Sequence, residues 1–159
     1  MVDRNQAVIN FLLTCPTISR NPLYFNLVKG ENNTNQILTS TEDRRLNTRY
    51  IDGSVGRRYV FTFITIKSMT DTAVINQTGY LNENVEDLSE VQAIADWIAE
   101  QRDLHNYPNF GEDCLVDDIY TTTDSPRLDG INTQVVPPLA MYSLSIQIDY
   151  LDRSKVLWN

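Results

Sequence analysis

The sequence predicts an α+β domain in which two helices cover one face of a mostly antiparallel sheet, and three stretches carry this prediction. Residues 137–152 alternate between apolar and mostly polar side chains, as a long strand with one covered face would. Residues 57–68 are dense in β-branched and aromatic side chains, which favours a second long strand with cover on both faces. Residues 85–103 repeat apolar side chains at helical spacing and predict a helix. Strand and helix each need cover, so we expect them to share one core.

The first stretch supplies the central strand of the predicted sheet. Pro137 and Pro138 cannot donate ladder hydrogen bonds, so we place them at the entrance of this strand. Its apolar face consists of Ala140, Tyr142, Leu144, Ile146, Ile148 and Tyr150. The predicted helix presents an apolar stripe of Leu88, Val91, Ala95 and Ile98, widened by Ile94 and Trp97. We therefore predict that the central strand packs against the helix through Tyr142, Leu144, Ile146 and Ile148 on one side and Val91, Ala95 and Ile98 on the other.

The remaining elements follow from shorter signals along the chain. Asp3 and Gln6 fit a capping box that starts an N-terminal helix, and Pro16 should end the helical pattern. Asp52 and Gly53 mark the turn of a hairpin that leads into the second long strand. Further strands are predicted at residues 23–29, 36–39 and 115–123, and loops at residues 124–126 and 129–130.

Composition limits the class of protein. The 159 residues suit one domain spanning positions 1–159, with a hairpin at about 40–60 and a C-terminal tip at 153–159. The net charge of −8 argues against a protein that clamps nucleic-acid phosphates. The chain has no apolar run of membrane-spanning length and does not open like a signal peptide, so we expect no membrane partner and a place in the cytoplasm or in a particle assembled there. Cys15 and Cys114 are expected to be free thiols.

Residue patterns for chemistry are weak throughout. His105 is the only histidine, and neither a nucleophile motif nor a cysteine with ligand spacing accompanies it. The segment at residues 53–56 lacks the lysine of a phosphate-binding loop. The acidic residues that flank the strand at 115–123 miss the spacing of a calcium loop; they are Glu112, Asp113, Asp117 and Asp118. We expect no catalytic, cofactor-binding or metal-binding residues.

The charges are divided between two regions. The predicted hairpin holds five of the thirteen basic residues, namely Arg44, Arg45, Arg49, Arg57 and Arg58. The predicted helix and its approach carry Glu83, Glu86, Asp87, Glu90, Asp96 and Glu100. Two interpretations stay open. The two regions are either solvated faces, or they meet head to tail, with the arginine hairpin of one copy against the acidic helix of the next.

The order of these elements resembles one family of virion proteins. An N-terminal helix precedes an arginine-bearing hairpin and the strand Y-V-F-T-F-I-T-I-K at residues 59–67. The helix E-V-Q-A-I-A-D-W-I at residues 90–98 and the closing strand P-P-L-A-M-Y-S-L-S-I-Q-I-D-Y-L-D-R at residues 137–153 complete the series. This order is similar to that of the tail terminator proteins, also called tail-completion or minor capsid proteins, of long-tailed bacteriophages of Gram-positive hosts.

The resemblance implies a hexameric ring on the head-proximal end of the tail tube, assembled in the host cytoplasm. Such a ring stops tube polymerisation and joins the tube to the neck or head-completion protein, and DNA passes through its lumen without specific binding. We expect contacts between copies or with the tube at Arg44, Arg45, Arg49, Arg57, Arg58, Glu86, Asp87 and Glu90. Leu157 and Trp158 would dock on an adjacent ring or fold back onto their own domain. Two alternatives remain: another neck or tail-tube ring protein, and a small soluble enzyme built around His105.

Overall fold

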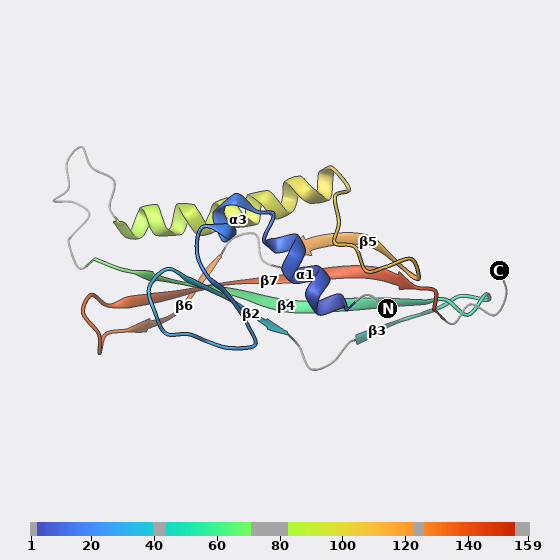
Figure 1. Cartoon of the computed structure of the whole chain (residues 1–159), viewed down its shortest axis with the longest axis horizontal. Coiled ribbons are helices and arrows are strands. Elements are labelled where there is room, and N and C mark those ends of the chain that lie inside the picture. Colours follow the sequence, from blue (N-terminus) through green and yellow to red (C-terminus); the bar gives the residue numbers. More distant parts are fainter. Residues whose placement is uncertain (1–2, 40–43, 71–82, 123–125, 155–159) are drawn as a thin grey trace.

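The computed structural model describes residues 3–39, 44–70, 83–122 and 126–154, and in these ranges the chain forms three helices and one seven-stranded sheet (Figure 1). The elements are α1 (Arg4–Leu12), α2 (Pro16–Ser19), β1 (Leu23–Phe25), β2 (Thr34–Thr39), β3 (Arg44–Arg49), β4 (Val55–Ser68), α3 (Glu83–Asp103), β5 (Cys114–Thr121), β6 (Arg127–Asn132) and β7 (Leu139–Asp152). The strand order is β1-β2-β4-β7-β5, with β3 beside β4 and β6 beside β7. Only the β1–β2 pair is parallel, so the predicted α+β fold with a mostly antiparallel sheet is confirmed.

The two long predicted strands form the spine of the sheet. β4 and β7 each span 14 residues and pair antiparallel from Val55↔Asp152 to Ser68↔Leu139. The buried positions of β7 alternate as predicted except at Ser143, which is also buried, and Ile146 and Ile148 are fully buried. β4 alternates in its first half, whereas its residues 63–67 are buried without a break. Cover on both faces is therefore confirmed for the second half of β4 only.

The helices cover one face of this spine. Leu144, Ile146 and Ile148 of β7 share a buried cluster with Ala95 and Ile98 of α3. A smaller cluster joins Val91 of α3 to Ala140 and Tyr142 of β7, so the predicted packing of strand on helix is confirmed. The N-terminal helix joins the same core through Val8, Phe11 and Leu12. The Phe11 and Trp97 rings lie 5.0 Å apart and tie α1 to α3.

Several local predictions are wrong, each for a physical reason. The strand predicted at residues 23–29 ends at Phe25, because Asn26 adopts a left-handed φ of 51° and its side chain accepts a hydrogen bond from the Thr39 amide. The N-terminal helix does end before Pro16, at Leu12, but Pro16 then begins a second short helix, α2, that the sequence did not predict and in whose first turn its missing N–H costs nothing. Leu88 is 44% exposed and is not part of the core. The loop predicted at residues 129–130 is part of β6, which pairs with the start of β7 through a bulge.

The arginine-rich hairpin is present and extends one end of the sheet. β3 pairs antiparallel with the first residues of β4, through Arg44↔Arg58, Arg45↔Arg57 and Arg49↔Val55. In the turn, the Tyr50 amide donates to the Ser54 carbonyl at 3.0 Å, and Gly53 has a φ of 94° that other residues rarely adopt. Asp52 accepts from the Ser54 amide at 2.9 Å. These bonds give the hairpin a defined end. It lies at the opposite end of the molecule from the start of α3 (Figure 1).

Candidate functional site

Two of the five hairpin arginines are held by carboxylates of their own chain. The Nε atom of Arg57 lies 2.8 Å from Oδ2 of Asp152, and both side chains are nearly buried. Burial alone would raise the pKa of Asp152, but hydrogen bonds from Ser154 and Arg57 outweigh it and lower that pKa. Arg58 donates through Nε to Oδ1 of Asp149, also at 2.8 Å. Both pairs cross from β4 to β7, so these arginines fasten the base of the hairpin to the spine.

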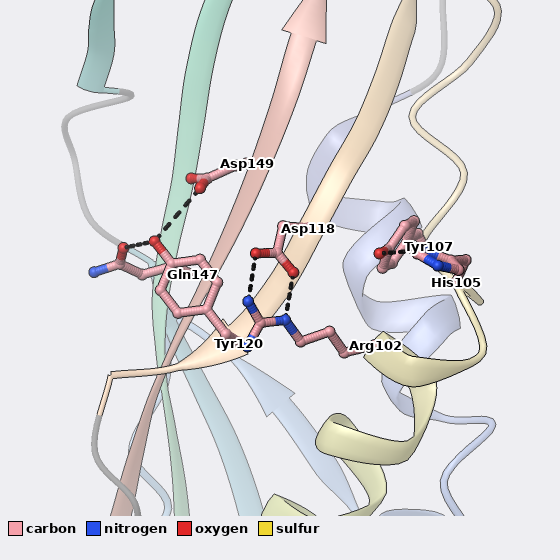
Figure 2. Close-up of polar contacts among 7 residues, drawn as sticks. All are labelled: Arg102, His105, Tyr107, Asp118, Tyr120, Gln147 and Asp149. Atoms are coloured by element: carbon pink, nitrogen blue, oxygen red, sulfur yellow. Dashed lines mark hydrogen bonds and ion pairs between the residues drawn. The ribbon is translucent and has the colours of Figure 1, made fainter.

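Beside the Arg58 pair, a polar network holds the edge strand β5 (Figure 2). The Tyr120 hydroxyl donates to Oε1 of Gln147 at 2.9 Å and also lies 3.4 Å from Oδ2 of Asp149. Arg102, in the last turn of α3, donates to both oxygens of Asp118 at 2.7 and 2.9 Å. Its guanidinium carbon is 5.5 Å from the centre of the Tyr120 ring. This bidentate pair of Arg102 and Asp118 holds the end of α3 against the edge strand β5. The network therefore stabilises the fold.

The acidic residues of α3 differ in what they contact. Glu90 lies 3.0 Å from Nζ of Lys67, whose side chain is only 5% exposed, so Glu90 neutralises a buried cation of β4. The Lys67 ammonium also donates to Oδ1 of Asn33 at 3.3 Å. Glu86 is exposed to solvent. Of the predicted acidic contacts, Glu90 therefore has a partner within its own chain and Glu86 is free to face outward.

Asp87 stands in the least favourable electrostatic position of the acidic helix. Its Oδ2 atom is buried and has no hydrogen-bond partner among the described residues. The pKa of Asp87 is raised to about 6, first by burial and then by the charge of Glu83, while the Lys67 ammonium acts in the opposite direction. An uncompensated carboxylate of this kind costs folding free energy at neutral pH.

The other predicted contact residues fall into two groups. Arg44, Arg45 and Arg49 all lie in β3, and Arg49 is exposed. Leu157 and Trp158 lie outside the described residues. The tip beyond β3 adds two residues that sequence reasoning missed: Tyr50 is 52% exposed and Ile51 is 93% exposed. The Asp52–Gly53 turn signal could have identified them, because a residue beside a hairpin turn has little of its own chain to cover it.

Features that could support chemistry are sparse in the described part of the chain. His105 is exposed and its Nδ1 lies 3.0 Å from the Tyr107 hydroxyl (Figure 2). A depression of about 480 Å³ lies between α1 and the segment after α3, and amide side chains such as Gln6, Asn10 and Asn106 line it. No group of three or more potential metal-ligating side chains occurs within the described ranges. None of the helices described there combines the length and the apolarity that crossing a membrane requires.

Comparisons of the chain with models of protein families, with curated proteins and with solved structures returned no match. The described residues place an arginine-bearing hairpin with an exposed tip at one end of the sheet and the acidic start of α3 at the other.

Proposed function

We propose that this chain is a structural virion protein that forms a ring, six copies in the family it resembles, on the head-proximal end of a bacteriophage tail tube. There it ends tube polymerisation and offers a joint to the neck or head-completion protein. The terminator resemblance of the sequence supports this proposal, and the α+β fold with an extended hairpin agrees with the order of elements on which that resemblance stands.

The observation that carries the proposal is the opposition of charge between the two ends of the sheet. One end is the hairpin whose first strand contains Arg44, Arg45 and Arg49, and the other is the start of α3 with Glu83 and Glu86. Opposite charges at opposite ends favour head-to-tail contacts, which close into rings when the rotation between copies permits. The net charge of −8 suits a ring past which DNA slides without being held.

The proposal is tested by light scattering and negative-stain imaging of the purified chain, with and without tail tubes of the same phage. We expect closed rings of one diameter, free in solution or seated at one end of each tube. Long tubes formed by the chain alone would favour the alternative of a tube subunit. A chain that stays monomeric and leaves the tubes bare would contradict the proposal.

A further inference from the structure

An apolar strip lies on the molecule at the end opposite the hairpin. Val91 of α3 covers Ala140 and Tyr142 at the start of β7. In the register of β6 with β7, Leu128 lies opposite Tyr142 and Ile131 lies opposite Ala140. Residues opposite each other in a ladder project from the same side of the sheet. Leu128 and Ile131 therefore flank the helix-covered face, yet about half of each remains exposed.

The flank of α3 that faces β6 continues this strip. Glu90 and Arg102 fix the rotation of the helix, since Glu90 pairs with Lys67 of β4 and Arg102 pairs with Asp118 of β5. Positions two apart on a helix differ by about 200°, so Leu88 lies on the flank away from Glu90, toward β5 and β6. Val85 lies one turn earlier on the same flank.

Together Val85, Leu88, Leu128 and Ile131 are named here the α3–β6 strip, and each of the four side chains is 42–52% exposed. Single exposed apolar residues need no explanation, but two on α3 and two on β6 that flank the same covered end of the sheet do. Exposed carboxylates lie beside it on α3, at Glu83 and Glu86, whereas on β6 the carboxylate of Asp129 is paired with the exposed guanidinium of Arg127 at 3.6 Å. The strip is thus apolar with an acidic margin on its α3 side, which is the composition of an interface core with a charged rim.

The tip of the hairpin has the complementary composition. Ile51 is 93% exposed and Tyr50 beside it is 52% exposed, and Arg49 precedes them with an exposed side chain. The turn that presents them is fixed by the bonds of Asp52 and Ser54, so little ordering entropy remains to be lost on docking. Arg57 and Arg58 are bound to Asp152 and Asp149, and it is therefore the tip beyond them that is left for a partner.

We propose that Tyr50 and Ile51 of one copy insert into the α3–β6 strip of the next copy, with Arg49 set against the acidic margin. The occupant is a second copy of this chain because the chain itself carries both complementary surfaces, at opposite ends of one elongated sheet (Figure 1). This contact is heterologous, so every copy gives its tip to one neighbour and receives a tip from the other. The inference rests on the proposed function in that it names the contact that would build the ring.

Two single variants, each lacking one of the two surfaces, test this inference. Ile51→Asp removes the tip and keeps the strip, and Leu88→Asp damages the strip and keeps the tip. Each should raise the dissociation constant of self-association by about 30-fold or more, as expected of an interface anchor. Mixed together, they should form a 1:1 dimer and nothing larger, because only one intact tip and one intact strip remain in each pair. Light scattering after size exclusion measures both results.

The matched control is Leu104→Asp. Leu104 is a 66% exposed leucine just beyond the other end of α3, so its variant should assemble like the wild type. Circular dichroism and thermal melting of all three variants show whether the domain is intact. Because Ile51 and Leu88 are exposed, both variants should melt like the wild type.

Three results would overturn the inference. Self-association that survives in both variants would place the contact elsewhere. A dimer formed by the Leu88→Asp variant alone would indicate a symmetric tip-to-tip contact. A wild-type chain that is monomeric at every accessible concentration would remove the second copy as the occupant. Binding of the rings to tail tubes is measured separately. Rings that cap tubes but form through another contact would refute this inference and leave the proposed function standing. Rings that depend on the hairpin tip but do not bind tubes would support this inference and contradict the proposed function.

Discussion

Replacing Asp87 by Asn should stabilise the folded chain at pH 8 and have little effect at pH 4. The folded pKa of Asp87 is about 6, against a value of 3.8 for an ordinary aspartate, because burial and the neighbouring Glu83 disfavour its charge. A raised pKa means that the folded state prefers the protonated form. The resulting stability is fully present below pH 3.8 and is lost as the pH rises through 6.

The size of this effect follows from the pKa difference. About two pKa units correspond to about 3 kcal/mol, at roughly 1.4 kcal/mol per unit. Asp87 is only half-buried and solvent screens its charge, so we expect a gain of about 1 kcal/mol at pH 8. Between pH 7 and pH 4 the gain should shrink toward zero, because the wild-type carboxyl then carries its proton.

Urea unfolding at several pH values, at a concentration where light scattering shows monomers, measures this gain. Glu86→Gln is the control: the side chain is exposed on the same helix, so its effect should stay within about 0.5 kcal/mol at every pH. A destabilised Asp87→Asn variant at pH 8, or a gain independent of pH, would refute the reasoning.

Three further predictions concern the core, the base of the hairpin and the C-terminal tip. Ile146→Ala should lower the free energy of unfolding, measured by chemical denaturation, by about 2–5 kcal/mol, because the side chain is fully buried at the centre of β7. The control Leu115→Ala, at a half-exposed site, should lower it far less. Arg57→Glu should destabilise the monomer by about 3 kcal/mol by placing a second carboxylate against the nearly buried Asp152, and a thermal melt equal to wild type would contradict the pairing. If the C-terminal residues 155–159 dock on a partner, deleting them should abolish binding to tubes or neck protein and leave the melting temperature unchanged. A lower melting temperature with binding retained would show that these residues fold back onto their own domain.

The sequence was sufficient for the spine of the fold and for its main helix. The alternation of β7 and the apolar stripe of α3 reflect burial against each other, and burial of one face produces a periodic pattern of apolar residues in the sequence. The sequence of β6 has no such pattern. Its side chains are mostly exposed and it contains Gly130, so only pairing with β7 makes it a strand.

The charged site was predictable in composition and not in detail. The arginine-rich and acidic segments are visible in the chain, but the partners of individual charges depend on the register of distant strands. Arg57 meets Asp152 because β4 and β7 pair antiparallel along their whole length, and the two residues are 95 positions apart. The sequence therefore predicted that all five arginines are available to a neighbour. The structure shows that Arg57 and Arg58 pair within their own chain, whereas Arg49 is exposed.

The most direct test of the proposed function is the growth of tail tubes in the presence of this chain. Tube subunits of the same phage are allowed to polymerise while the purified chain is added in increasing amounts, and tube lengths and tube ends are scored by electron microscopy. We predict that mean tube length falls with the amount of chain and that each arrested tube carries one ring at one end only. Tubes that keep growing at the normal rate with both ends bare, or a chain that adds along the tube as a further subunit, would contradict it.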